Sequence, residues 1–370
     1  MTSQFRNTYI PSSVSPPGDT LAELLNEKGM SQKEFAERCG RPEKTINEII
    51  KGKAAITPET ALQFERVLGA PAEFWNTRET HYREYLVRKA ESERLQNEKN
   101  WLNKFPINQM IKFGWIRDYR KNTAEQVIEV LNYFGIASPE QWDVDWKKTS
   151  TAFRKSEKCK NSPESISAWL RRGELKASEI HCKNYDKKVF ESALIEIRKL
   201  TTESDPHIFL PILKEKCSRS GVALVFVPNL QGAPVSGAAR WLTPDKALIQ
   251  LSIRHKTDDH LWFSFFHEAA HILLHSKKRI FIDLSDNEIN KFCDIEEEAD
   301  QFASERLIPA KILTNWIEGV RNFSADNVSA FAKSIRVSPG IVVGRLQHIQ
   351  KIPRENLNKL KVRYEWEQQA

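Results

Sequence analysis

The stretch FFHEAAHILLH, residues 265–275, sets three histidines and a glutamate into an otherwise apolar segment. On a helix, His267 and His271 project from one face, because residues four apart lie about one turn from each other. Two imidazoles at this spacing can hold one zinc ion, and Glu268 then lies beside the ion, where it can take a proton from water. The alternative is a buried helix with hydrogen-bonded core histidines. A metal better offsets the cost of burying these polar groups.

A third ligand is expected from DIEEEADQFASERLIP, residues 294–309. Glu296 and Asp300 share one face of a second predicted helix, so Glu296 would bind the metal. Asp300 would accept the other ring N–H of a histidine ligand and fix its tautomer. Glu297 and Glu298 fit a solvated acidic face. His275 is about 12 Å beyond His267 along the axis, too far to share the ion, and is expected at the helix end or behind a ligand.

Together, these two segments resemble the ImmA/IrrE metallopeptidases. The resemblance covers about residues 206–350 and includes HEAAHILLH and the residues that follow Glu296 at the family's spacing. It departs from the pattern at Arg306 and Ile308. The resemblance implies an α+β zincin-like fold, zinc bound by His267, His271 and Glu296, and Glu268 as general base. It also implies cleavage of helix-turn-helix repressors of phage, mobile-element or stress-response genes.

The other end of the chain carries a series of helix signals. Thr20-x-x-Glu23 and Ser31-x-x-Glu34 are capping boxes, and Thr57 can cap a helix that begins with Pro58. MSQKEFAERCG followed by RPEKTINEIIKGKAAIT resembles the Xre/Cro-type helix-turn-helix, and more narrowly the HigA-type antitoxins. The resemblance implies a five-helix, lambda-repressor-like domain that binds double-stranded operator DNA, and a homodimer.

Residues 42–51 are the predicted recognition helix, with Pro42 in its first turn, since its polar side chains are left over once the apolar face is buried. The candidate DNA-contacting residues are Gln32, Glu43, Lys44, Thr45, Asn47 and Lys51. Gln and Asn can read adenine, whereas the lysines would meet phosphate. The alternative is a small helical bundle with solvated charges, which the acidic Glu43 and Glu48 keep open.

The sequence predicts a mainly α protein with a small β-sheet. Residues 1–18 read as a flexible arm, 19–76 as the helix-turn-helix domain, 77–205 as a helical connector and 206–370 as the peptidase domain with a helical C-terminus. VALVFV (222–227) and KALIQLS (246–252) read as strands on either side of the turn-prone QGAPVSG, and helices are expected at 257–275, where Thr257 or Asp258 can cap, and 286–307. Residues 327–347 mimic a second helix-turn-helix, interpreted as packing within the peptidase domain.

Composition sets few further limits. The five cysteines form no CxxC pair, which favours a reducing cytosol over a disulfide framework. No apolar run reaches the ~18 residues of a membrane span, so a cytoplasmic protein is expected. The net charge of +7 permits a polyanionic partner without requiring one.

Two functions therefore compete. The first is a DNA-binding, HigA-type antitoxin-like regulator whose zinc peptidase cleaves a helix-turn-helix repressor or a related regulator. The second is a non-catalytic antitoxin or repressor, in which the peptidase fold serves only as an interaction surface for a repressor or toxin protein. The intact ligands and base favour the first.

Overall fold

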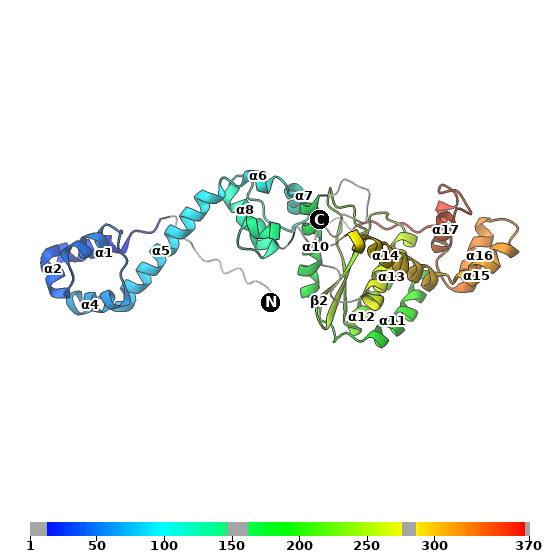
Figure 1. Cartoon of the computed structure of the whole chain (residues 1–370), viewed down its shortest axis with the longest axis horizontal. Coiled ribbons are helices and arrows are strands. Elements are labelled where there is room, and N and C mark those ends of the chain that lie inside the picture. The colour runs from blue at the N-terminus through cyan, green and yellow to red at the C-terminus, as the bar shows by residue number, and fades with distance from the viewer. Residues whose placement is uncertain (1–12, 145, 147–161, 276–285, 367–370) are drawn as a thin grey trace. The chain divides into compact units, whose positions relative to one another are not determined.

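The computed structural model describes residues 13–144, 146, 162–275 and 286–366, with side chains of the last range described from residue 294 (Figure 1). Most of the predicted arm, residues 1–12, lies outside these ranges. The predicted fold class is confirmed: helices dominate, and a small sheet of β1, β2 and β3 belongs to the C-terminal part. By contacts, the described residues form two compact units. The first runs to Lys99 and includes Tyr119–Ile128, and the second holds Asn100–Asp118 and the chain from Glu129.

The first unit is built on five helices. They are α1 (Pro17–Glu27), α2 (Gln32–Cys39), α3 (Glu43–Ile50), α4 (Pro58–Leu68) and α5 (Ala72–Leu95). Phe64 lies at the centre of their core, with its ring centroid 5.0 Å from that of Phe35 and 5.4 Å from that of Trp75. All three rings are fully buried. Burial of such aromatic side chains stabilises a small domain by about 1.5–3 kcal/mol each.

Of the helix starts predicted for this unit, two are confirmed and two are wrong. Ser31 and Thr57 accept the predicted hydrogen bonds from the backbone N–H groups of Glu34 and Thr60, both at 3.2 Å. The capping box at Thr20 is wrong, because α1 already begins at Pro17, whose fixed φ suits a first helical position. Pro42 precedes α3 as its N-cap residue instead of lying in the first turn.

Helices continue through the predicted connector. They are α6 (Lys99–Leu102), α7 (Ile107–Lys112), α8 (Thr123–Phe134), α10 (Pro163–Ser178), α11 (Lys187–Lys199) and the short η1 (Leu200–Thr202). Helix α12 (Pro206–Arg219) follows at the start of the predicted peptidase domain. Helix α5 passes through the predicted boundary at residue 76. The domain boundary at residue 206 remains a proposal. Helix α10, which precedes this boundary in the sequence, packs on the sheet.

The sheet has the order β1–β3–β2. Strands β1 (Val222–Phe226) and β3 (Lys246–Leu251) are parallel, and β2 (Gly237–Thr243) is antiparallel to β3. The sequence predicted β1 and β3 but not β2, whose Gly and Ala residues have low strand propensity. This segment forms a strand because it pairs with β3, beginning at Gly237 opposite Leu251.

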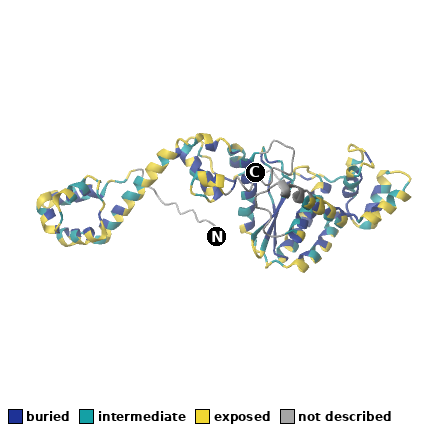
Figure 2. Cartoon of the chain, in the orientation of Figure 1, coloured by how far each residue is buried: buried dark blue, intermediate teal, exposed yellow. Residues whose placement is uncertain are grey.

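The two faces of the sheet meet different helices. Ala247, Ile249 and Leu251 of β3 join the main core, which includes apolar residues of α12 and of α13 (Asp258–Leu274) (Figure 2). Gln250 points to the opposite face, where its amide donates to the carbonyl of Trp169 in α10 at 2.6 Å. The helix that carries the histidines is thus held against a buried sheet.

The remaining helices follow α13 in the chain. They are α14 (Asp286–Leu307), α15 (Ala310–Gly319), α16 (Ala325–Ile335), α17 (Pro339–His348) and the short η3 (Asn358–Leu360). Of these, α14 and α17 pack against α13. Val328 and Val342 of the segment that mimics a helix-turn-helix are fully buried in the main core, in agreement with a packing role. Helix α17 lies against α13 at Gly340 and Gly344, where a Cβ would come within 2.6 Å of the carboxylates of Asp258 and Asp259. None of the helices in the described ranges has the length and apolar character needed to cross a bilayer.

Asp258 ties the start of α13 to the C-terminal elements. Thr257 takes the N-cap position but forms no side-chain cap, contrary to one predicted option. Asp258 instead accepts from the backbone N–H of Val362 at 3.1 Å and contacts the hydroxyl of Ser338. Burial raises the pKa of Asp258 to about 6.

We predict that Asp258→Asn changes the pH dependence of stability. The folded-state pKa of Asp258 lies above its unfolded value, so the folded chain loses stability as the pH rises from about 4 to about 6. Asn avoids this loss while still accepting from Val362. Urea unfolding followed by tryptophan fluorescence is expected to show the variant gaining on the order of 2–3 kcal/mol over the wild type between pH 4 and pH 7. A difference that does not change with pH would contradict the prediction.

Candidate metal centre and helix-turn-helix surface

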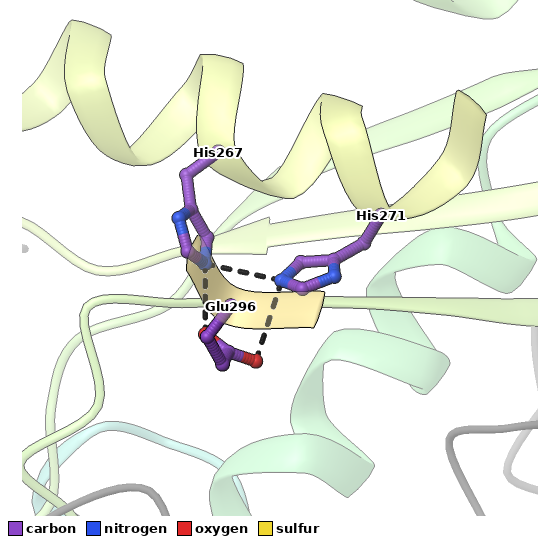
Figure 3. Close-up of side chains that lie close together, drawn as sticks. All are labelled: His267, His271 and Glu296. Carbon is purple, nitrogen blue, oxygen red and sulfur yellow. Dashed lines mark hydrogen bonds and ion pairs between the residues drawn. The ribbon is translucent and has the colours of Figure 1, made fainter. Parts of the chain in front are cut away.

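Helices α13 and α14 bring the three predicted metal ligands together. The Nε2 atoms of His267 and His271 lie 3.0 Å apart. Each also faces Glu296: Oε2 is 3.2 Å from His267 Nε2, and Oε1 is 3.6 Å from His271 Nε2 (Figure 3). One ligand atom from each residue lies within 4.8 Å of the other two.

The donor set fits a zinc ion. Two imidazole nitrogens and one carboxylate oxygen are the protein ligands of many catalytic zinc sites, which leave a further position open. The imidazoles are largely buried, with 16% and 14% of the side chains of His267 and His271 exposed. Three convergent donors in a mostly buried setting are suited to a cation, because unpaired polar groups there would otherwise be costly.

A second layer of residues orients both imidazoles. The Nδ1 of His267 lies 2.8 Å from Asp300 Oδ1, so an Nδ1–H that donates to this carboxylate leaves Nε2 free as a ligand. His271 Nδ1 lies 2.9 Å from His275 Nδ1, and His275 Nε2 lies 3.2 Å from Glu298 Oε2. If His271 donates to His275 and His275 donates to Glu298, the Nε2 of His271 is free as well.

The two histidines have pKa values shifted in opposite directions. Burial lowers the pKa of His267, but hydrogen bonds to Asp300 and Glu296 outweigh it and raise the pKa to about 10. Burial raises the pKa of Glu296, but the hydrogen bond with His267 outweighs burial and lowers this pKa below its usual range. Burial lowers the pKa of His271 to about 4. A metal at this site therefore competes with a proton on His267.

Glu268 lies beside the cluster and against the sheet. Only 7% of the residue is exposed, and burial raises the pKa of its carboxyl to about 8. Gly237, the first residue of β2, faces it so closely that a Cβ there would come 2.5 Å from Glu268 Oε1. A cation held by the neighbouring histidines would lower this pKa and favour the carboxylate that a general base requires.

Sequence reasoning missed two features of this site. Gly237 appeared only as part of a turn, although a glycine beside a strand can mark a close approach of the backbone. Glu298 was expected on a solvated face, but it pairs with His275, and more than half of its side chain remains exposed. The spacing of His275 from His271, one helical turn, was the available signal.

The predicted DNA-contacting residues lie on α2, on α3 and at the end of α3. Gln32 begins α2, Lys51 follows α3 as its C-cap residue, and both are exposed. Glu43 and Lys44 are exposed in the first turn of α3, while Thr45 and Asn47 are half-buried. Lys44 Nζ lies 3.9 Å from Glu48, one turn along the helix, and this exposed pair contributes little. Ile46 and Ile49 face the core, which leaves the polar side chains of α3 outward.

Comparison with known protein families assigns a class to each of these two regions. Residues 21–75 match the helix-turn-helix model, and residues 223–347 match the IrrE N-terminal-like domain of peptidase family M78. The first match spans α1 to the start of α5, and the second runs from β1 to α17. The chain therefore joins a helix-turn-helix domain of the Xre type to a metallopeptidase-like domain.

One curated relative is similar to part of this chain. It is the uncharacterized HTH-type transcriptional regulator YddM of Escherichia coli (strain K12), 37% identical over 59 residues. The match covers 16% of this chain, and the chain spans 63% of the length of that protein. The similarity supports the helix-turn-helix assignment.

The metal centre can be tested with a pair of adjacent glutamates on α14. We expect the purified protein to bind one zinc ion per chain, and Glu296→Gln to weaken zinc affinity at least about tenfold, because the amide removes the anionic ligand. Glu297→Gln is the matched control, since Glu297 is exposed and lies outside the cluster. Competition with a chromophoric chelator measures the affinity. Equal affinities of the two variants would exclude Glu296 as a ligand.

Proposed function

We propose that this protein is a DNA-binding transcriptional regulator whose C-terminal domain is a zinc-dependent endopeptidase. One observation carries the peptidase proposal: His267, His271 and Glu296 converge from two helices, and the carboxylate of Glu268 lies beside them. A fold kept only as an interaction surface has no need of this convergence. The helix-turn-helix match and the outward polar side chains of α3 support the DNA-binding role.

The chemistry would be metal-assisted hydrolysis of a peptide bond. Zinc bound by His267, His271 and Glu296 would supply Lewis acidity, which makes water more acidic and polarises the scissile carbonyl. Glu268 would accept the proton of the attacking water and pass it to the nitrogen of the leaving amine. Asp300 would keep the Nδ1–H of His267 in place, so that its Nε2 stays directed at the cluster.

Among the described residues no further strand pairs with the outer edge of β2, and this edge offers a way to bind an extended peptide. Strand β2 pairs with β3 on one side and ends the sheet formed by the described residues. Its first residue, Gly237, lies against Glu268. A peptide that added to this edge by main-chain hydrogen bonds would run next to the base, and such pairing reads little of the peptide's sequence.

The finer assignments follow the sequence resemblance. We propose that the regulator is related to HigA-type antitoxins, that it binds operator DNA as a homodimer, and that it works in the cytoplasm. Its peptidase substrate would be a helix-turn-helix repressor or a related regulator, or a partner toxin. The base would be Glu268, and the DNA contacts would come from Gln32, Glu43, Lys44, Thr45, Asn47 and Lys51.

Glu268→Gln tests the peptidase. The amide cannot accept the proton of water, so cleavage is expected to fall by about 10²–10⁴-fold. Zinc content and DNA binding should be retained, because Glu268 is not a proposed ligand. Zinc-loaded protein is incubated with helix-turn-helix proteins encoded near its gene, and products are identified by mass spectrometry. If the wild type and the variant act alike on every such protein and on repression, the domain serves as a surface and the peptidase proposal fails.

Lys51→Gln tests the DNA-binding surface. If Lys51 meets a phosphate, its loss reduces the slope of log affinity against log salt by about 0.9 for duplex DNA. Lys311→Gln, an exposed lysine on α15, is the control and should leave the slope unchanged. Fluorescence anisotropy with one labelled duplex at several salt concentrations gives both slopes. Equal slopes for the two variants would remove Lys51 from the interface.

A further inference from the structure

A pocket lies at the carboxyl ends of the parallel strands β1 and β3. Its walls come from the segment after β1 (Pro228 to Pro234), the segment after β3 (Ile253 to Lys256), α10 and the end of α7, and its volume is about 950 Å³. All of these elements belong to the second compact unit. The carboxyl ends of parallel strands are where open α/β sheets commonly bind small ligands.

The pocket is strongly cationic. Among the described residues that line it, five are lysines or arginines and none is a carboxylate: Lys112, Arg172, Lys176, Arg254 and Lys256. Lys256 has Glu365 at 3.7 Å, but both side chains are more than half exposed, so this pair contributes little. A concave surface with one sign of charge concentrates ligands of the opposite sign.

Two of these cations, Arg172 and Lys176, lie on α10 one turn apart. Lys176 donates from Nζ to the carbonyl of Phe226, the last residue of β1, at 2.9 Å. The Nε of Arg172 is buried and has no hydrogen-bond partner among the described residues. Burial, followed by the charges of Arg172 and Lys214, lowers the pKa of Lys176. A bound anion would relieve this repulsion and supply Arg172 with an acceptor.

Aromatic rings form another part of the wall. Phe113 and Trp115 lie with ring centroids 5.5 Å apart and planes tilted by 35°, and Trp366 also lines the pocket. Flat aromatic faces bind planar rings by stacking, which contributes about 1–3 kcal/mol per nucleic-acid base. The pocket thus combines sites for an anion with sites for a planar ring.

We propose that this pocket binds a nucleoside phosphate. The phosphates would contact the ammonium group of Lys176 and the guanidinium groups of Arg172 and Arg254, whose planar form suits phosphate oxygens. The base would lie against Phe113, Trp115 or Trp366. A peptide of acidic residues alone would satisfy the cations but has no ring to lie against the aromatic wall, whereas a nucleoside phosphate accounts for both features. The ligand would occupy the same end of the sheet at which Gly237 approaches Glu268.

Isothermal titration calorimetry of the full chain tests this proposal with four probes: ATP, adenosine, inorganic triphosphate and hexaglutamate. ATP is expected to bind at least tenfold more tightly than each of the others. Arg254→Gln and Trp366→Ala should each weaken ATP binding at least fivefold. Both residues lie on surface segments, and unchanged circular dichroism would show that the variants fold. Lys333→Gln, an exposed lysine on α16, is the control and should bind ATP like the wild type.

Several results would overturn the proposal. The absence of ATP binding, or ATP affinity unchanged in both Arg254→Gln and Trp366→Ala, would exclude this pocket. Inorganic triphosphate as tight as ATP would remove the role of the base, and tighter hexaglutamate would assign the pocket to an acidic peptide. Because the readout is binding, the result is independent of whether the peptidase cleaves anything.

Discussion

The candidate metal site of the C-terminal unit depends on the close approach of two imidazoles and one carboxylate. His267 and His271 place their Nε2 atoms 3.0 Å apart, on a helix whose other neighbours in this region are mostly apolar. Without a cation, the doubly protonated His267 donates from Nε2 to Glu296 and from Nδ1 to Asp300. With a cation, the same three donors become ligands, and the layer of Asp300, His275 and Glu298 fixes their orientation.

Much of the surrounding fold positions α13 so that this convergence is possible. The buried face of β3 supports the helix from one side, and α14 supplies Glu296 and Asp300 from another. At its start, α13 is fixed by Asp258 and by the ion pair between Asp259 and Lys361, 2.7 Å long and nearly buried. The helix-turn-helix unit has a core of its own around Phe64, to which α3 contributes Ile46 and Ile49 but not its polar side chains.

How much the sequence could predict differed from element to element for physical reasons. Local signals placed the cap at Ser31, the helix over residues 286–307 and the common helical face of Glu296 and Asp300, because these depend only on residues near in sequence. That His267 is the histidine that meets Asp300 depends on how α13 packs against α14. Strand β2 and the approach of Gly237 to Glu268 could not be predicted, since both depend on pairing with β3 across the fold. The capping box at Thr20 failed because Pro17 begins the helix earlier, and the pair of His275 and Glu298 depends on how α13 packs against α14.

The most direct test of the account is X-ray absorption spectroscopy at the zinc edge of the zinc-loaded protein. We predict a first shell of nitrogen and oxygen atoms at about 2.0 Å, with the multiple-scattering signature of two imidazoles and no sulfur. A shell that contains sulfur, or the signature of fewer than two imidazoles, would contradict the claim that His267, His271 and Glu296 hold one ion.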